Sequence, residues 1–158
     1  VVYENPSPGN KMGGITTLED KSLGCVQKGG RAPVSGVLKY GDRVKKSGMN
    51  LLTGTGNDLV STPVQSAAGA HMILFTTGRG TPLGAPVPTV KIATNTALSE
   101  KKANWIDFNA GRLLQEDSDK VLNDFITLIQ RIASGEVKTK NEENGYTEIS
   151  ILKDGVVL

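Results

Sequence analysis

The sequence contains one cysteine and one histidine, and aromatic residues make up only 4% of its 158 residues. A single cysteine excludes an internal disulfide, and we expect Cys25 to be a small buried residue. One histidine and one cysteine cannot build a metal centre of soft ligands. A metal held by this chain alone would need oxygen ligands such as Glu19, Asp58 or Asp107, so the metal ligands stay unassigned at this stage.

Strong net charge and long apolar runs are also absent. The net charge is +2 and the basic residues are scattered, so we expect no nucleic-acid partner. No segment is typical of a signal peptide or a membrane span, and we expect no membrane association. Together with the single cysteine, these features predict a cytoplasmic protein.

The length suits one compact domain with a sizeable core. The first residues, VVYENPSPGN, lack a methionine and contain two prolines, which is typical of a connection from an upstream region. We therefore expect a connecting loop at residues 1–15. Residues 16–158 would then form a single α/β domain, the C-terminal fragment of a larger protein.

Glycine, in contrast, is plentiful: 19 residues cluster in a few loops. The two clearest clusters are TGTGND at 53–58 and TTGRGTPLG at 76–84, and each follows a predicted strand, at 49–52 and 71–75. Clustered glycine between strands and helices indicates turns at which the backbone approaches a ligand.

The order of the elements predicts the fold class. A helix at 58–70, a strand at 89–95 and a long helix at 118–135 follow the first strand. The other expected elements are a loop at 5–14, a helix over 16–30, a short strand or turn at 103–111 and a final strand at 144–155, at an edge or as part of an arm. This order favours an α/β three-layer sandwich with a mainly parallel, Rossmann-like sheet. Both glycine clusters would leave strands at the same sheet edge and lie side by side.

The first cluster, TGTGND, comes just before a helix, where backbone N–H groups and the helix dipole favour an anion. Its spacing matches neither a P-loop nor the dinucleotide fingerprint, and a helix-capping turn is an equally good interpretation. Because Asp58 would repel a phosphate, we interpret it as a general base or as a partner for hydroxyls or a metal. Asn57 would bind a substrate hydroxyl beside it.

In the second cluster, Arg79 lies between two glycines, so neighbouring side chains do not shield its guanidinium group. This planar group can bind a carboxylate through two parallel hydrogen bonds. A surface arginine on a flexible turn is the alternative. We expect a polyhydroxylated acid as ligand, with Arg79 on its carboxylate and the rest of the cluster on its hydroxyls. The substrate-binding candidates of this cluster are Thr76, Thr77, Gly78, Gly80 and Thr81.

Two lysines are candidates for stabilising negative charge, although most lysines are merely solvated. They are Lys11, in the segment GNKMGG, and Lys91, in the strand at 89–95. Asn109 could supply a further polar group to the same cleft. The candidate catalytic residues are thus Asp58, Arg79, Lys11 and Lys91.

Long stretches of the chain resemble the C-terminal part of the altronate dehydratase family. The matching stretches are PGNKMGGITTLEDKSLGCVQKGG, GNDLVSTPVQSAAGAHMILFTTGRGTPLGAPVPTVKIATN, WIDFNAGRLL and ASGEVKTKNEENGYTEISILKDGV. The family, also called altronate hydrolase, includes galactarate dehydratase and is similar to the sulfolactate sulfo-lyases. The resemblance runs from about residue 5 to the end, and FTTGRGTP is its most specific motif.

The resemblance implies a hydro-lyase that converts D-altronate to 2-keto-3-deoxy-D-gluconate with a divalent metal, Fe²⁺ above all. Members of the family carry an N-terminal domain and a central region, which this sequence does not contain. We expect most metal ligands to come from those regions, and this fragment alone to be inactive.

Other interpretations stay open at this stage. Galactarate dehydratase, of the same family, is one alternative function. A non-catalytic module that binds phosphate or a nucleotide through its glycine loops is another. The oligomeric state also stays open, with a homo-oligomer as one alternative.

Overall fold

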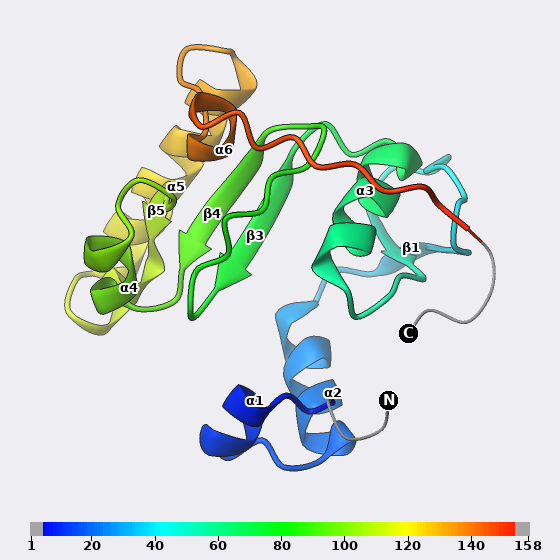
Figure 1. The fold of residues 1–158 in the computed structure, drawn as a ribbon, viewed down its shortest axis with the longest axis horizontal. Helices are drawn as coiled ribbons and strands as arrows, with labels where there is room; N and C mark the ends of the chain where they lie inside the picture. The colour runs from blue at the N-terminus through cyan, green and yellow to red at the C-terminus, as the bar shows by residue number, and fades with distance from the viewer. Residues whose placement is uncertain (1–4, 154–158) are drawn as a thin grey trace. The chain divides into compact units, whose positions relative to one another are not determined.

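The computed structural model describes residues 5–153, and its contacts divide the chain into two compact units (Figure 1). The described part of the first unit comprises residues 5–37 and 46–51, and that of the second comprises residues 38–45 and 52–153. The predicted boundary between a connecting loop and a single domain at residue 15 stays a prediction.

The first unit begins with two helices, α1 (Pro8–Met12) and α2 (Leu18–Lys28). The prediction of a loop at 5–14 is wrong over α1, because the Ser7 side chain caps that short helix and its backbone N–H bonds back to Asn10. The predicted helix over 16–30 is confirmed, with Thr17 as its cap. Neither helix buries a residue, and Cys25 is exposed rather than buried.

Two short strands form a separate two-stranded sheet: β1 (Val34–Leu38) and β2 (Met49–Leu52). The strand predicted at 49–52 is therefore confirmed. However, β2 is not part of the sheet that contains the later strands. The expectation that both glycine clusters leave strands of one sheet is wrong for this reason.

The second unit begins its regular structure with α3 (Asp58–Ala68). The Asn57 side chain accepts a hydrogen bond from the Leu59 N–H and caps this helix. Pro63 lies inside the helix and is buried. The helix ends at Gly69, whose φ of +114° lies in the left-handed region that favours glycine.

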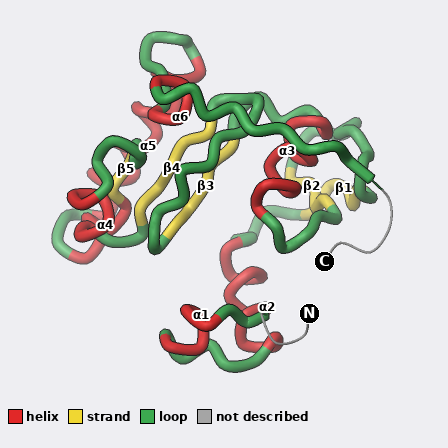
Figure 2. The backbone as a smooth tube through the Cα atoms, in the orientation of Figure 1, coloured by secondary structure: helices red, strands yellow, loops and turns green. Residues whose placement is uncertain are grey.

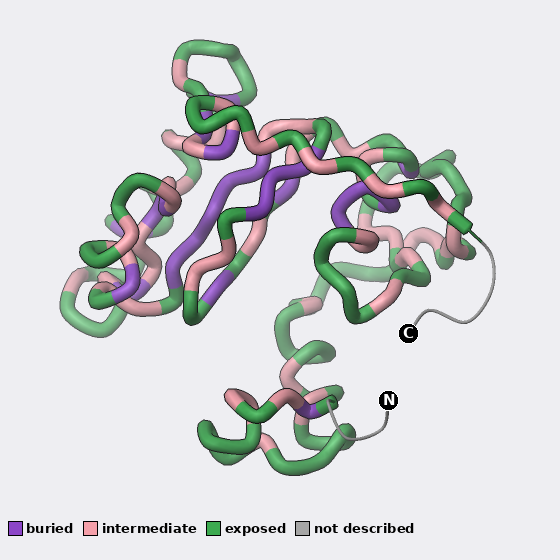
Figure 3. Tube along the Cα trace, in the orientation of Figure 1, coloured by how far each residue is buried: buried purple, intermediate pink, exposed green. Residues whose placement is uncertain are grey.

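The main sheet has three parallel strands in the order β3 (Ile73–Thr77), β4 (Thr89–Ala93) and β5 (Phe108–Asn109) (Figure 2). The α/β class and the parallel sheet are therefore confirmed. The Rossmann-like three-layer sandwich stays a prediction. β4 is the central strand, and all five of its residues are buried (Figure 3).

Three short helices and one long helix complete the second unit. The short ones are α4 (Thr96–Lys101), the 3-10 helix η2 (Ala110–Leu114) and α6 (Lys140–Glu143), and the long one is α5 (Ser118–Ala133). The 16-residue α5 confirms the predicted long helix, with Gly135 at φ +76° just beyond it. No helix within residues 5–153 combines the length and the apolar character that crossing a membrane requires.

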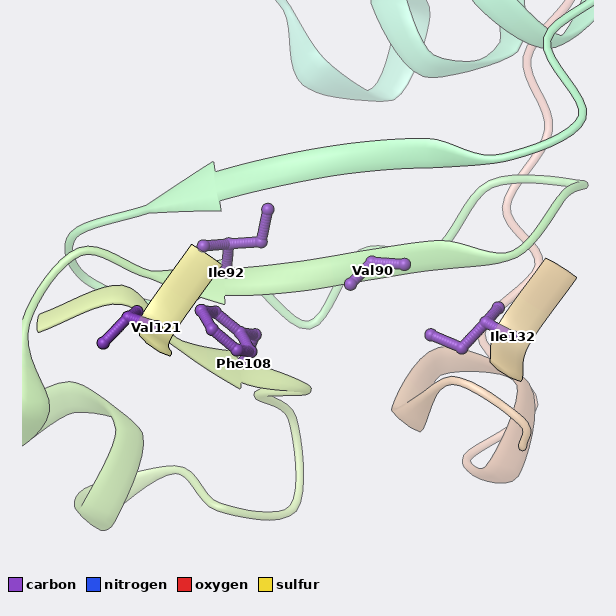
Figure 4. Packing of buried hydrophobic residues seen from close by; sticks show 5 residues of the cluster. All are labelled: Val90, Ile92, Phe108, Val121 and Ile132. Carbon is purple, nitrogen blue, oxygen red and sulfur yellow. The ribbon is translucent and has the colours of Figure 1, made fainter. Parts of the chain in front are cut away.

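The core lies between α5 and one face of the sheet (Figure 4). Its buried members are Val90, Ile92, Phe108, Val121 and Ile132. The rings of Phe108 and Phe125 add a tilted contact, with centroids 4.9 Å apart. Side chains alternate along a strand, and Val90 and Ile92 face α5. Thr89, Lys91 and Ala93 therefore face the opposite side of the sheet.

A helix-free loop, residues 78–88, connects the parallel strands β3 and β4 and runs back alongside them (Figure 1). The C-terminal segment, residues 146–153, follows this loop without forming a strand. Its Glu148 N–H donates to the Gly84 carbonyl at 3.1 Å. The prediction of a final strand is wrong for 144–153, where the chain forms no strand, while positions 154 and 155 lie outside the described residues.

Candidate functional site

The motif predicted to bind the substrate lies where β3 ends. Thr76 and Thr77 are the last residues of β3, and the buried Thr77 hydroxyl accepts a hydrogen bond from the Gly80 N–H at 2.9 Å. Gly80 has a φ of +82°, and a Cβ there would lie 2.8 Å from Cδ of Lys102. The glycine is thus required both by the backbone conformation and by close packing. Residues 76–81 are called the TTGRGT loop below.

Three side chains outside the TTGRGT loop donate hydrogen bonds to its backbone carbonyl oxygens. The pairs are Lys91 Nζ to Thr81 O at 2.6 Å, Asn95 Nδ2 to Gly78 O at 3.2 Å, and Lys102 Nζ to Gly80 O at 3.5 Å. Asn95 also caps α4, because its Oδ1 accepts from the Leu98 N–H. β4 and the residues that flank α4 at its two ends therefore hold this loop through its carbonyls.

Arg79 is exposed, and no residue in the range 5–153 forms an ion pair with it. The ion pairs of the second unit involve other side chains, such as Arg112 with Glu116. The guanidinium of Arg79 is therefore free, as far as the described chain shows, to bind an anion. The role of Arg79 as a carboxylate clamp stays a prediction.

Lys91 is 2% exposed, and it lies on the face of β4 opposite Val90. Its Nζ lies 5.3 Å from the centroid of the Phe75 ring, within the range of a cation–π contact. Burial of the ammonium group lowers its pKa below the ordinary value of 10.5. The negative charges of Asp107, Glu148 and Asp58 act on this pKa in the opposite direction, the effect of Asp107 being the largest.

Asp107 bridges β4 and the start of α6 through two hydrogen bonds. One carboxylate oxygen accepts from the Lys91 N–H at 2.6 Å, and the other accepts from the Lys140 N–H at 2.7 Å. Burial raises the pKa of Asp107, and these two hydrogen bonds oppose the rise. Both oxygens are thus occupied by backbone donors, which points to a structural role for Asp107.

Asp58 is exposed in the first turn of α3, next to the capping residue Asn57. A cleft of about 280 Å³ opens between this helix and the preceding glycine cluster. It is lined by Leu52, Gly54, Thr55, Ser61, Val64 and Gln65. Its hydroxyl and amide groups are suited to the hydroxyls of a small ligand. Ser61 and Gln65 had no signal in the sequence, because polar residues within a predicted helix are usually solvated.

Two further residues, Lys11 and Asn109, were predicted to belong to the site. Lys11 is exposed on α1, in the first unit, so its role in charge stabilisation stays a prediction. Asn109 caps η2 by accepting from the Gly111 N–H at 2.9 Å and donates to the Thr96 hydroxyl at 3.1 Å. Its expected role as a substrate ligand also stays a prediction.

Glu148 is a residue that sequence reasoning missed. Its side chain accepts from the Gly84 N–H at 2.8 Å, and its backbone N–H bonds to the Gly84 carbonyl. The Ser150 hydroxyl bonds to the carbonyl of Leu59 in the first turn of α3. The segment 146–153 therefore links the loop after β3 to the start of α3. The sequence indicates an extended arm here but not its partner.

The acidic residues named from the sequence as metal ligands, Glu19, Asp58 and Asp107, do not form a cluster in the described part of the chain. Within residues 5–153 no group of three or more His, Cys, Asp or Glu side chains could hold a metal ion. The oxygen donors suggested by the sequence are therefore not assembled into a binding site within this range.

Comparison with known proteins supplies the wider context. The profile of the family described as "D-galactarate/Altronate dehydratase, C-terminal" matches residues 1–157. The chain is 56% identical over 99% of its length to proteins named "Altronate dehydratase" from Bacillus subtilis and Escherichia coli. It is 38% identical over 89% of its length to the Escherichia coli protein "Galactarate dehydratase (L-threo-forming)". It covers 32%, 32% and 28% of these proteins, about a third of their length.

Proposed function

The chain belongs to the family of D-galactarate/altronate dehydratase C-terminal domains, and we propose that it is part of an enzyme that dehydrates D-altronate to 2-keto-3-deoxy-D-gluconate. The identity to proteins named altronate dehydratase carries this proposal: it is 56%, against 38% for the galactarate relative. Galactarate is therefore the less favoured substrate. The same proposal includes a cytoplasmic location and, as partners, the other regions that the longer relatives contain.

The reaction is an elimination of water. A base takes the proton on the carbon next to the carboxylate, and the hydroxyl on the following carbon leaves with a proton as water. The resulting enol rearranges to the 2-keto acid. Negative charge accumulates on the carboxylate during this process, so a fixed positive charge beside it lowers the barrier.

We propose Arg79 as the group that supplies this charge. It is exposed, and it lies on a loop whose carbonyls are held by neighbouring side chains. We assign the carboxylate to Arg79, hydroxyl contacts to Thr76 and Thr81, and proton transfer to Asp58, near the polar cleft. Lys11 stays a candidate for further charge stabilisation. A divalent cation, such as Fe²⁺, would add Lewis-acid stabilisation, and its ligands would come from the rest of the protein.

The test is an assay of the full-length protein that contains this chain, with and without Fe²⁺, on D-altronate, galactarate and related sugar acids. Release of 2-keto-3-deoxy-D-gluconate from altronate is the expected result, with weaker turnover of galactarate. The isolated chain is expected to be inactive. A full-length protein that dehydrates none of these acids would rule out the function.

The role of Arg79 is tested by Arg79→Lys in the same full-length protein. Because lysine cannot form the two parallel hydrogen bonds, kcat/KM for altronate should fall about 10- to 100-fold. Arg131→Lys is the matched control, since Arg131 is half-exposed and pairs with Glu136 at the surface. Unchanged kcat and KM in Arg79→Lys would mean that the clamp lies elsewhere.

A further inference from the structure

Lys91 is a lysine in a position that suits an apolar residue. It sits at the middle of the central strand and is 2% exposed, between two residues that belong to the apolar core. Burying an ammonium group costs free energy that a methionine of similar length would not cost. Its one side-chain hydrogen bond, to the Thr81 carbonyl at 2.6 Å, is therefore the main contact that distinguishes lysine from an apolar side chain here.

Two of the three hydrogen bonds to the loop, those from Asn95 and Lys102, also determine where N–H groups of the loop point. The Thr81 carbonyl that Lys91 holds precedes Pro82, which has no N–H, so Lys91 fixes the end of this segment. In a trans peptide the carbonyl and the following N–H point in opposite directions. The peptides of this loop are trans, because the one cis bond of the described chain precedes Pro6. Since the Gly78 and Gly80 carbonyls accept from Asn95 and Lys102, the N–H groups of the next residues point away from those side chains.

Those two N–H groups belong to Arg79 and Thr81. No hydrogen bond within residues 5–153 uses either of them. With the exposed Arg79 guanidinium they form a set of donors on the same short loop. These two N–H groups flank the N–H of Gly80, which is already used by the Thr77 hydroxyl. Unused backbone N–H groups close to a guanidinium group favour an anion.

We propose that Lys91 is a positioning residue that, through the Thr81 carbonyl, holds residues 78–81 so that Arg79 and two peptide N–H groups receive the carboxylate of the sugar acid. The inference rests on the proposed function and deepens it. Lys91 itself does not touch the substrate, because its side chain is enclosed beneath the loop. Asn95 acts in the same way through the Gly78 carbonyl.

The first experiment is a double-mutant cycle in the full-length enzyme with D-altronate. Lys91→Met should raise KM about 10-fold while kcat changes little, because the carboxylate site becomes looser. In an Arg79→Ala background, the same Lys91→Met change should alter KM by only about 2-fold, since the charged donor is absent and only the two peptide N–H groups are left to position. Equal effects in both backgrounds would overturn the proposal, because a purely structural role predicts additivity.

A second variant guards against misfolding of Lys91→Met. Asn95→Asp keeps the oxygen that caps α4 but replaces the amide that donates to Gly78 by an oxygen that repels its carbonyl. It should raise KM and should also lose its effect in the Arg79→Ala background. For Lys91→Met the matched control is Lys101→Met, because Lys101 is exposed at the end of α4 and the same change there should leave KM unaltered. An unchanged KM in Asn95→Asp would contradict the proposal.

The second experiment does not depend on activity. Amide hydrogen exchange of the full-length protein should be faster in a peptide covering residues 76–85 of Lys91→Met than in the wild type. Exchange in α5 should be unaffected. If the wild type dehydrates no sugar acid, the proposed function fails while this measurement still reports on Lys91. Unchanged exchange in 76–85 would overturn the positioning role.

Discussion

Both faces of β4 are buried, but the side chains on the two faces differ in polarity. Toward α5, Val90 and Ile92 join a cluster of apolar residues (Figure 4). On the other face, the buried Thr89 and Lys91 make hydrogen bonds to the loop that connects β3 to β4. Every buried side-chain nitrogen or oxygen atom in the described part of the chain has a hydrogen-bond partner. The α5 face is thus apolar packing. The other face carries satisfied polar groups at Thr89 and Lys91, and beyond them Ala93 packs in a small apolar cluster with Leu98 and Ile106.

The difference follows from what covers each face. α5 satisfies its own backbone, so it needs only apolar contacts from the sheet. The connection at 78–88 has no helix, and its backbone carbonyls need donors from elsewhere. Lys91 and Asn95 supply them from β4 and its continuation. We infer that the α5 face mainly stabilises the second unit, whereas the loop face fixes the geometry of the candidate site.

The largest expected effect comes from the apolar face. Phe108→Ala removes a buried ring that packs on Val90, Ile92 and the Phe125 ring, so unfolding free energy should fall by about 3–5 kcal/mol. Urea dependence of hydrogen exchange in α5, within the full-length protein, measures this change. The control is Leu114→Ala, since Leu114 is 89% exposed and its loss should matter by less than about 0.5 kcal/mol. Similar losses for both variants would contradict a core at this face.

A smaller effect is expected where the C-terminal segment meets the loop. A Cβ at Gly84 would lie 2.0 Å from the Tyr146 carbonyl oxygen, so Gly84→Ala must separate the two segments and break both bonds to Glu148. Overpacking and two lost hydrogen bonds should together cost about 2–3 kcal/mol.

Hydrogen exchange of residues 84–89 and 146–150 in the full-length protein measures that cost. Gly56→Ala is the control, because a Cβ at Gly56 would meet nothing within 4 Å. If Gly84→Ala exchanges like the wild type, the segment is not held as the structure has it. Loss of protection confined to the loop face would sharpen the contrast with α5.

Much of the fold could be predicted because its signals are periodic. The alternation in β4 and the helical spacing in α5 come from side chains that face a core, and both elements are confirmed. The placement of β2 could not be predicted, because strand pairing depends on long-range contacts rather than on its own residues. The helix α1 was missed since its proline, glycine and asparagine suit a turn as well as a capped first turn.

The sequence identifies the exposed residues of the candidate site, but not the side chains that hold its loop in place. The unshielded Arg79 follows from the glycines beside it. The contact of Lys91 with the Thr81 carbonyl could not be predicted, because a lysine in a strand gives no sign that both faces of that strand are covered. Glu148 lies 64 residues from the Gly84 amide that it accepts from, so no local pattern connects them. Such contacts appear only when the chain is folded.

The smallest expected effect concerns the pH dependence of stability. Burial lowers the pKa of Lys91 in the folded chain, so between that lowered pKa and its ordinary value of 10.5 the unfolded chain binds more protons than the folded one. Stability from this residue therefore rises as pH rises through that window, and it is lost again as pH falls. Lys91→Met should lack this rise, whereas the exposed Lys101→Met should keep it. The difference between wild type and variant in thermal unfolding of the full-length protein, measured from neutral pH toward pH 10.5, isolates the effect from that of other lysines. A wild type and a Lys91→Met variant with parallel curves would mean that the ammonium group is as well solvated as an exposed one, and the polar face of β4 would then be open to water rather than closed by the loop.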